Sequence, residues 1–358
     1  MRIVFDLDGV ICDLKKPSES YSEVNPKKKV IQKIRNLKEQ GHYVIIHTGR
    51  HMRTCDGDVT KVIEKIGKIT EEWLAKWDVP YDELIFGKPY ADVYIDDLGI
   101  EFSTSEKLGE KLESIQPVIV IPMAGEGKRF KDEGFLEPKC MIKVKNKTLF
   151  EWSMVSLPIS ISKKVIFVCL EKHEKDFGIS KFIKNIMDEK YPKSKYELVY
   201  LKQTTGGQAE TVLHTKHLIR PENILIIYNI DTHFVSTRLK SKILTMKNRD
   251  VDGLIGCFES DNNDLSYVEI DEKKFVKQVK EKEKISNNAS TGLYIFTNAK
   301  QFFQAAEEMI KKNIKVKDEF YVSEIYNILL DSGKRFEIDV AEEFIPLGTP
   351  NDIKKTEA

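Results

Sequence analysis

Several polar residues in the first third of the chain could together handle a phosphate ester. Asp6 and Asp8 end a short apolar run, and Thr48 and Lys88 follow later ones. A carboxylate that attacks an anionic phosphate needs positive charge beside it. We therefore assign Asp6 as the nucleophile and Lys88, with Thr48, as groups that bind the phosphate. Asp8 is assigned to proton transfer at the leaving oxygen.

Carboxylates in the same region could hold a divalent cation. Asp96 and Asp97 are adjacent and follow another short apolar run. Because Mg²⁺ prefers oxygen ligands, we expect one Mg²⁺ ion among four carboxylates: Asp6, Asp8, Asp96 and Asp97. Arg50, which ends the motif His47-Thr48-Gly49-Arg50, is assigned to substrate binding.

A second set of chemically suited residues follows residue 117. The apolar run Val118–Pro122 opens into Ala124-Gly125-Glu126-Gly127-Lys128-Arg129, and Lys139 comes ten residues after Arg129. Glycines let backbone N–H groups approach phosphates, and basic side chains add positive charge. The pattern indicates transfer of a nucleotidyl group. We assign Lys128, Arg129 and Lys139 to catalysis and Ala124, Gly125 and Gly127 to nucleotide binding.

Two further features support this second site. Thr205-Gly206-Gly207-Gln208-Ala209-Glu210-Thr211 is a glycine-rich turn that opens a helical pattern and can approach a flat base closely. Asp231 ends the apolar run Ile224–Asn229 and is expected to bind the Mg²⁺ ion that bridges nucleotide phosphates. The nucleotide-binding residues assigned to this region are Gln203, Gly207, Gln208 and Ala209.

The elements predicted around the first motifs would bring them to one edge of a sheet. Strands are predicted over Arg2–Phe5, Tyr43–His47, Leu84–Phe86 and Val93–Ile95, and helices over Lys29–Gln40 and Asp58–Trp77. Strands that alternate with helices predict a parallel sheet. In such a sheet, ligands bind beyond the carboxyl ends of the strands, which is where these motifs lie.

A break at Gln116-Pro117 follows the predicted helix Glu106–Ile115, and proline is disfavoured inside a helix. We therefore predict two Rossmann-like α/β domains, residues 1–115 with a parallel sheet and residues 117–358 with a mixed sheet. In the second domain, strands are predicted over Val118–Pro122, Lys164–Cys169, Tyr196–Leu201, Ile224–Asn229, Gly253–Glu259, Tyr267–Ile270 and Gly292–Thr297, and helices over Lys181–Lys190, Ala299–Lys311, Tyr321–Gly333 and Asn351–Ala358.

Composition narrows the function classes. The chain has 358 residues, and its 57 basic and 57 acidic residues cancel, which gives no support to a nucleic-acid partner. No apolar run approaches the roughly 20 residues that span a bilayer, and no signal peptide is evident. The five cysteines show no metal-ligand or redox spacing. We expect a cytoplasmic protein without a membrane partner, and a homo-oligomer is compatible with the sequence.

The first segment resembles the haloacid dehalogenase-like (HAD) phosphohydrolases over about residues 1–115. Asp6-Leu7-Asp8-Gly9-Val10 fits their first motif, Thr48 the second, Lys88 the third and Asp96-Asp97 the fourth. The resemblance implies a Mg²⁺-dependent phosphatase in which the first aspartate is transiently phosphorylated. The segment is short and leaves little room for a separate cap domain, so the cap is expected to be minimal.

The second segment resembles the nucleotidyltransferases that make nucleotide sugars, over about residues 117–355. The likeness implies a GT-A-like mixed sheet and assigns Glu281, Lys282 and Gly292 to binding of the acceptor. One departure concerns the C-terminal turn Gly348-Thr349-Pro350. Many relatives carry a second metal-binding aspartate just before this turn, whereas here the residues are Phe344-Ile345-Pro346-Leu347.

Together these resemblances imply a bifunctional enzyme of nucleotide-activated sugar or polyol synthesis, with Mg²⁺ at both sites. A nucleoside triphosphate and a phosphorylated sugar or polyol would be its substrates, and bacterial capsular or surface polysaccharide assembly would be its setting. The alternative is a cytidylyltransferase for a non-sugar phosphate such as phosphocholine, with the first domain a scaffold or regulatory module. The sequence leaves the base and the acceptor open.

Overall fold

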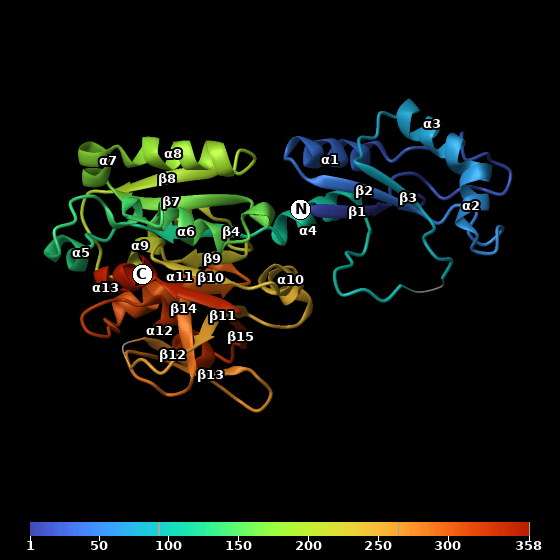
Figure 1. Cartoon of the computed structure of the whole chain (residues 1–358). Coiled ribbons are helices and arrows are strands. Elements are labelled where there is room, and N and C mark those ends of the chain that lie inside the picture. The colour runs from blue at the N-terminus through green and yellow to red at the C-terminus, as the bar shows by residue number, and fades with distance from the viewer. Residues whose placement is uncertain (92–93, 264, 358) are drawn as a thin grey trace. The chain divides into compact units, whose positions relative to one another are not determined.

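The computed structural model describes residues 1–91, 94–263 and 265–357. The chain divides into two compact units, Met1–Leu112 and Glu113–Ala358, and the division falls inside helix α4 (Ser105–Ser114). Figure 1 draws the first unit in blue to teal and the second in green to red. Each unit is described by itself.

The first unit is built on strands that run in one direction. Its other elements are β1 (Arg2–Asp6), α1 (Lys28–Glu39), β2 (Tyr43–Thr48), α2 (Val59–Val62), α3 (Lys68–Lys76) and β3 (Glu83–Phe86). Among the described residues they form a parallel three-stranded sheet in the order β1-β2-β3. Asp6 is paired with His47 and Thr48 with Phe86, so the three carboxyl ends meet at one edge of the sheet.

A single helical stretch covers part of this sheet. Between α2 and α3 the chain forms a π-helical segment, Ile63–Gly67, so the three pieces continue one another. Ile66, Thr70 and Trp73 are buried on its inner side. The helix predicted over Asp58–Trp77 is therefore present, with a local widening that the spacing of apolar residues does not reveal.

The fourth strand predicted for this sheet, Val93–Ile95, falls partly outside the described residues, and its described part forms no strand. Val93 lies outside the described residues, while Tyr94 and Ile95 belong to no strand and the Ile95 residue is 99% exposed. An apolar run of three residues is too short to distinguish a buried strand from an exposed connection. Asp96 and Asp97 consequently follow no strand of the sheet.

The second unit contains a larger mixed sheet. Its strands are β4 (Val118–Pro122), β5 (Lys143–Val144), β6 (Lys147–Thr148), β7 (Lys164–Leu170), β8 (Tyr196–Leu201), β9 (Leu225–Tyr228), β10 (Thr232–Val235), β11 (Gly253–Glu259), β12 (Ser266–Ile270), β13 (Val276–Glu281), β14 (Asn288–Phe296), β15 (Phe336–Val340) and β16 (Glu343–Pro346). Its helices are α5 (Lys128–Asp132), α6 (Leu149–Val155), α7 (Glu171–Phe177), α8 (Ile179–Lys190), α9 (Gln208–Leu213), α10 (Leu239–Thr245), α11 (Ala299–Lys311), α12 (Val322–Asp331) and α13 (Pro350–Glu357).

The strand order of this sheet explains how distant motifs meet. Within the described residues, the path is β13-β12-β14-β9-β4-β7-β8, and β11 joins β14 to β15. β4 runs parallel to both β7 and β9, whereas β14 runs antiparallel to β9. The two-domain α/β fold with a parallel sheet and then a mixed sheet is therefore confirmed.

Strand β13 was not predicted, because its sequence is rich in charged residues. The run Lys277–Lys284 suggests a solvated surface, yet its first part, up to Glu281, belongs to β13. In that strand Val276, Val279 and Glu281 are buried, and the residues between them are more exposed. Alternate residues of a strand point to opposite faces, and the register shift at Lys277 brings Val276 to the face of Val279 and Glu281. That face joins the core, while Lys280 points away from it.

His42 links the start of β1 to the turn before β2. Its Nδ1 lies 2.9 Å from the amino group of Met1, and the residue is 8% exposed. Burial, and then the positive amino group, lower the pKa of His42 to about 4. Because the unfolded chain binds this proton near its ordinary pKa of about 6.5, stability is full above that pH and is lost as pH falls toward 4.

We expect the free energy of unfolding of the wild type to fall by up to about 3 kcal/mol between about pH 7 and pH 4 on account of His42. His42→Gln, which retains an acceptor for the amino group, should flatten this dependence. Urea unfolding at several pH values measures the effect, with the exposed His217→Gln as a control. A pH slope that is equal in His42→Gln and the wild type would contradict the assignment.

Candidate active sites

The nucleotide site of the second unit is positioned by strand register. β4 and β9 are parallel neighbours, with Val120 opposite Ile227, so their carboxyl ends lie side by side. The glycine-rich loop that follows β4 therefore lies beside Asn229 and Asp231, which follow β9. Since β14 is antiparallel to β9 and pairs Leu293 with Tyr228, it places Gly292 against Asn229.

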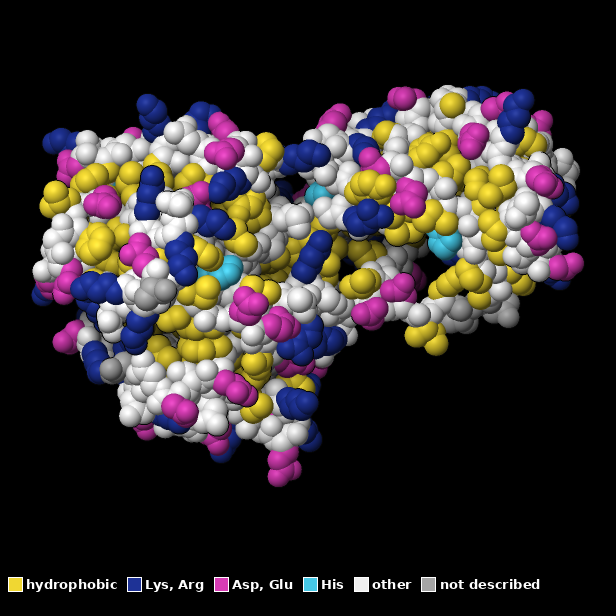
Figure 2. Space-filling view, viewed as in Figure 1, with side chains coloured by type: hydrophobic (Ala, Val, Ile, Leu, Met, Phe, Trp, Pro, Cys, Tyr) yellow, Lys and Arg dark blue, Asp and Glu magenta, His cyan; other side chains and the backbone are white. Residues whose placement is uncertain are grey.

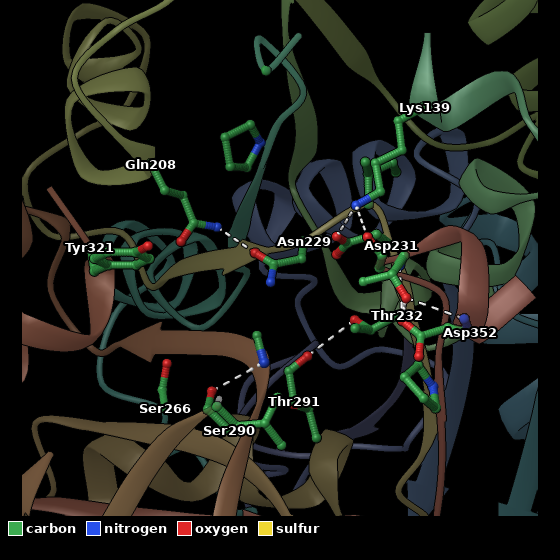
Figure 3. A pocket seen from close by; sticks show the side chains of 18 of the residues that line it. Lys139, Gln208, Asn229, Asp231, Thr232, Ser266, Ser290, Thr291, Tyr321 and Asp352 are labelled. Carbon is green, nitrogen blue, oxygen red and sulfur yellow. Dashed lines mark hydrogen bonds and ion pairs between the residues drawn. The ribbon is translucent and has the colours of Figure 1, made fainter. Parts of the chain in front are cut away.

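A cavity of about 1840 Å³ opens at this edge of the sheet. Figure 3 shows Gln208 and Tyr321 on one side of it and Lys139, Asp231 and Asp352 on another. The structure brings together most of the residues assigned from the sequence. Those that line the cavity are Ala124, Gly125, Gly127, Arg129, Lys139, Gly207, Gln208, Asp231, Glu281, Lys282 and Gly292.

Three assigned residues do not line this cavity. Lys128 and Gln203 are exposed outside it, and Ala209 is fully buried. Ala209 contributes through its backbone, because its N–H donates to the carbonyl of Phe320 over 3.0 Å. In the glycine-rich loop, Arg129 is thus the basic side chain that faces the cavity in this structure.

Lys139 links segments from the beginning and the end of the second unit's sequence. Its Nζ lies 2.5 Å from Oδ2 of Asp231 and 2.9 Å from the carbonyl oxygen of Gly348. The Asp231 side chain is 24% exposed and the Lys139 side chain 21%, so the pair is partly shielded from water. A lysine from the loop after β4 is therefore fixed between the metal-binding candidate and the C-terminal turn.

A second carboxylate approaches Asp231 across Gly348. A Cβ atom added to Gly348 would lie 3.4 Å from Oδ2 of Asp231 and 3.9 Å from Oδ2 of Asp352. Asp352 also accepts bonds from the N–H and hydroxyl of Thr349. Mg²⁺ typically takes one or two protein carboxylates and completes its shell with phosphate oxygens and water. Asp231 and Asp352 fit that requirement, although the residues just before the turn include no carboxylate.

The turn that opens α9 is held by close backbone packing. A Cβ atom at Gly207 would lie 2.4 Å from the backbone nitrogen of Phe320, and that N–H donates to the carbonyl of Gly206 over 2.9 Å. Next to it, Nε2 of Gln208 donates to Oδ1 of Asn229 over 2.5 Å. Asn229 in turn fits against Gly292, where a Cβ would lie 2.3 Å from its amide nitrogen.

A tight turn that the sequence did not reveal forms another wall. Lys317 and Asp318 both have positive φ, of 46° and 67°, and Val316 and Glu319 exchange two backbone hydrogen bonds around them. Tyr321 follows and lines the cavity with Glu319. Burial first, and then the charge of Glu319, raise the pKa of the Tyr321 hydroxyl well above its ordinary value. A hydrogen bond between this hydroxyl and the Glu319 side chain contributes to the same rise in pKa.

The far end of the cavity is built around Glu281. Its side chain is 2% exposed and accepts hydrogen bonds from the hydroxyls of Ser266 and Ser323. Lys282 Nζ lies 3.5 Å from the same carboxylate, and Lys282 has a left-handed backbone with φ of 60°. A non-glycine residue in that conformation is strained and is commonly found at functional sites.

Other residues at this cavity carried only weak sequence signals. Asn229 immediately follows β9, and strand ends are where ligand contacts concentrate. His173 is buried at the cavity wall, and burial lowers its pKa. Tyr267, by contrast, is fully buried and donates its hydroxyl to the carbonyl of Asn262. Spacing alone cannot tell such a packing residue from one that faces a ligand.

In the first unit, the structure brings Asp6, Thr48 and Lys88 to the same sheet edge. Lys88 Nζ lies 2.6 Å from Oδ2 of Asp6, and the backbone N–H of Lys88 donates to the carbonyl of Thr48 over 3.2 Å. The Thr48 residue is fully buried, and its hydroxyl accepts from the N–H of Arg50. An aspartate with a lysine beside it is an arrangement suited to an anionic phosphate.

Arg50 occupies a different place from the substrate-binding one assigned to it. Its side chain is fully buried and contacts both oxygens of Asp8, with Nε at 3.0 Å from Oδ2 and Nη2 at 3.0 Å from Oδ1. Thr70 and the Tyr21 ring, which are distant in sequence, pack against the guanidinium. The position of Arg50 in the motif does not indicate this packing. Arg50 therefore reaches Asp8 and not the surface.

The predicted Mg²⁺ ligands of the first unit are not assembled in this structure. Asp96 is exposed and caps the backbone N–H of Leu98, and Asp97 is also exposed. Among the described residues, no group of three or more acidic, histidine or cysteine side chains could hold a metal ion. The described residues just before them, Tyr94 and Ile95, belong to no strand and therefore do not carry these aspartates to the sheet edge.

Fold and site define the second unit as an α/β protein with a nucleotide-sized cavity at the carboxyl ends of its strands. A family model described as nucleotidyl transferase matches residues 118–353. The chain belongs to this family. A second family model, described as haloacid dehalogenase-like hydrolase, matches residues 3–68. Both resemblances seen in the sequence are thus confirmed.

Solved structures share the fold of the second unit. A nucleoside-diphosphate-sugar pyrophosphorylase from Vibrio cholerae RC9 is 24% identical, with a TM-score of 0.56, and the match covers 67% of this chain and 99% of that one. The inositol-1-phosphate CTP transferase from T. maritima is 15% identical, with a TM-score of 0.54 and coverage of 68% and 97%. A UDP-glucose pyrophosphorylase bound to UDP-glucose is 16% identical, with a TM-score of 0.55 and coverage of 68% and 97%.

No curated protein sequence matches the chain. In the part of the chain that the structure describes, no helix has the length and apolar character needed to cross a membrane. On the face shown in Figure 2, Lys and Arg side chains are interspersed with Asp and Glu, as expected from the equal numbers of the two charges.

We predict that Gly292→Ala impairs the nucleotide site beyond the cost of its backbone conformation. Gly292 has φ of 82°, and the new methyl group would displace the Asn229 amide and disturb its bond to Gln208. We expect nucleotide turnover to fall at least about tenfold, since small displacements of positioned groups reduce rates strongly.

Gly333→Ala provides the matched control for this variant. Gly333 has a similar φ of 78° but has no atom within 4 Å of an added Cβ. Both variants should lose roughly 1 kcal/mol of stability from the strained backbone, and only Gly292→Ala should lose turnover. Equal activities of the two variants would contradict the contact between Gly292 and Asn229 as the cause.

Proposed function

We propose that the second unit transfers a nucleotidyl group from a nucleoside triphosphate to a sugar or polyol phosphate and releases pyrophosphate. The observation that carries this proposal is the single cavity that joins the glycine-rich loop, the Lys139–Asp231 pair and the Glu281–Lys282 pair. Phosphate, base and acceptor functions thus have residues in one continuous space. The family match supports the same reaction class.

In this reaction a phosphate oxygen of the acceptor attacks the α-phosphorus of the triphosphate. A new P–O bond forms, the bond to the bridging oxygen between the α- and β-phosphorus breaks, and pyrophosphate leaves with its electron pair. The acceptor phosphate is already a good nucleophile, so positioning and charge neutralisation carry the catalysis. Lys139 would hold the phosphates, while Arg129 and the exposed Lys128 would stabilise the leaving pyrophosphate.

Magnesium would be bound by Asp231, with Asp352 as the nearby second carboxylate. When bound, the ion would neutralise phosphate charge and help to align the triphosphate. Lys139 now pairs with Asp231, so its positive charge keeps that carboxylate compensated. The Gly348 carbonyl, which Lys139 also contacts, fixes the C-terminal turn beside both carboxylates.

The acceptor end favours a polyhydroxylated phosphate. Glu281 and Ser266 line the cavity and offer polar atoms to a hydroxylated acceptor, Ser323 holds Glu281 from behind, and Lys282 can contact a phosphate. The Vibrio cholerae and UDP-glucose relatives act on sugar compounds by their names. We place the reaction in the cytoplasm, in the assembly of bacterial capsular or surface polysaccharide, with phosphocholine as the alternative acceptor.

The test is ³¹P NMR of the protein with Mg²⁺, each common nucleoside triphosphate and a panel of sugar, polyol and choline phosphates. A diphosphodiester signal with one pair of substrates would name both. Lys139→Met and Asp231→Asn should each lower that signal's rate of formation by about 10²–10³-fold, because each removes a charge that the transition state requires.

Lys131→Met, in α5, serves as the control for loss of a nearby lysine. Lys131 pairs with Glu126 over 3.3 Å at the surface, and exposed pairs contribute only about 0–1 kcal/mol. Its activity should stay near that of the wild type. Inorganic phosphate as the product with every triphosphate and acceptor, and no diphosphodiester, would overturn the proposed transfer.

A second activity, hydrolysis of a phosphate monoester, is favoured for the first unit by the Asp6–Lys88 contact. A carboxylate oxygen of Asp6 would attack phosphorus, and the P–O bond to the leaving group would break as Asp8 gives it a proton. Water would then attack the aspartyl phosphate, return a proton to Asp8 and release inorganic phosphate with Asp6 restored. Mg²⁺ at Asp6, Asp8, Asp96 and Asp97 stays a proposal, since these carboxylates do not form a metal-binding group in this structure.

We expect Asp6→Asn to lower phosphate release by at least about 10³-fold, because an amide cannot replace the nucleophile. Release is measured with purified full-length chain, Mg²⁺ and a panel of sugar mono- and bisphosphates. Asp13→Asn, an exposed neighbour, should retain activity, as should nucleotidyl transfer in Asp6→Asn. Phosphate release that is unchanged in Asp6→Asn, or absent from the wild type, would favour the scaffold or regulatory role instead.

A further inference from the structure

Arg50 makes an unusually complete set of contacts to Asp8. Nε lies 3.1 Å from Oδ1 and 3.0 Å from Oδ2, and Nη2 lies 3.0 Å from Oδ1. The thiol of Cys12 also donates to Oδ1, over 3.4 Å. The guanidinium fork therefore fixes the plane of the carboxylate as well as its position.

The Arg50 side chain is itself held from several directions. It is fully buried, and Nη1 donates to the hydroxyl of Thr70 over 3.3 Å. Its guanidinium carbon lies 4.5 Å from the centre of the Tyr21 ring, which is a cation–π distance. Thr70 in turn donates to the carbonyl of Ile66, inside the π-helical segment. The buried charge of Arg50 is thus paired with Asp8, and Thr70 and Tyr21 fix its orientation.

The two oxygens of Asp8 are not equivalent in this arrangement. Oδ1 receives Nε, Nη2 and the Cys12 thiol, whereas Oδ2 receives Nε alone. The Asp8 side chain remains 20% exposed. Oδ2 is thus the oxygen with capacity left for a further hydrogen bond from water or a substrate group.

We propose that Arg50 is a positioning residue, which acts on the reaction of the first unit only by aiming Oδ2 of Asp8. This inference rests on the phosphatase activity proposed above. A buried arginine cannot bind substrate itself, yet it can decide whether Asp8 meets the leaving oxygen and, later, the attacking water. Its loss should therefore slow both proton transfers and leave substrate affinity nearly unchanged.

The test uses the full chain with Mg²⁺ and para-nitrophenyl phosphate, whose nitrophenolate leaves readily without a proton. In Arg50→Lys, which keeps the charge and loses the fork, formation of the aspartyl phosphate should continue and its hydrolysis should slow. We expect kcat to fall about 100-fold and KM to change little. A burst of nitrophenol and a phosphoryl group on Asp6, seen by intact mass after acid quench, should accompany the fall.

β-Glycerophosphate, whose alkoxide is a poor leaving group, separates the first step. With this substrate Arg50→Lys should show the same loss of kcat or a greater one and no burst, because the first step now also needs the proton from Asp8. Thr70→Val is the matched control: it removes one bond to Nη1 and leaves Asp8 untouched. A loss near fivefold or less is expected for it, the effect of about one hydrogen bond.

Because Arg50→Lys disturbs a buried site, Tyr21→Leu provides a second variant. It removes the ring beneath the guanidinium without leaving a charge unpaired. We expect a nitrophenol burst and a fall in kcat that are both smaller than those of Arg50→Lys. Unchanged kcat in both variants, or a fall in kcat without phosphorylated Asp6, would overturn the positioning role while leaving the phosphatase intact. A wild type that releases no phosphate from either substrate would overturn the phosphatase and this inference together.

Discussion

In both units, an aspartate at the carboxyl end of a strand or shortly beyond it is paired with a lysine from another segment. Asp6 meets Lys88 and Asp231 meets Lys139, at 2.6 Å and 2.5 Å. All four side chains are between one fifth and one third exposed, so water screens these pairs only in part. An aspartate left alone at such an edge, facing an anionic phosphate, would repel it. The parallel register of the strands brings the segments that carry these two lysines close to the two aspartates.

Close backbone approach is the second constraint, and it is tightest in the second unit. The turn at Gly207 touches the backbone of Phe320, and Gly292 touches the amide of Asn229. These contacts align Gln208 and Asn229 as a pair that can present one polar edge to a base. The Lys139–Asp231 pair lies between this end of the cavity and the buried Glu281 network at the other.

The sequence predicted the residues at strand ends well, because their positions follow from the apolar runs before them. Asp231 could be assigned in this way, and Lys139 from its spacing to the glycine-rich loop, although nothing local indicates that they touch. Arg50 was assigned to substrate because it follows a motif residue, whereas three-dimensional packing buries it on Asp8. Asp96 and Asp97 depended on a predicted strand of three residues, too short for the pattern to be decisive. Tyr321 and Asp352 lie at the cavity through turns whose geometry depends on distant contacts.

The contact of Lys139 with the Gly348 carbonyl joins residues that are 209 positions apart. Such a contact forms only after the intervening chain has found its place, and the entropy of closing so long a loop must first be overcome. During synthesis, the loop after β4 leaves the ribosome long before the C-terminal turn does. The phosphate end of the cavity is therefore completed only after the turn at Gly348 has been translated, so a nascent chain that has already folded much of its sheet still lacks the contact that fixes this lysine.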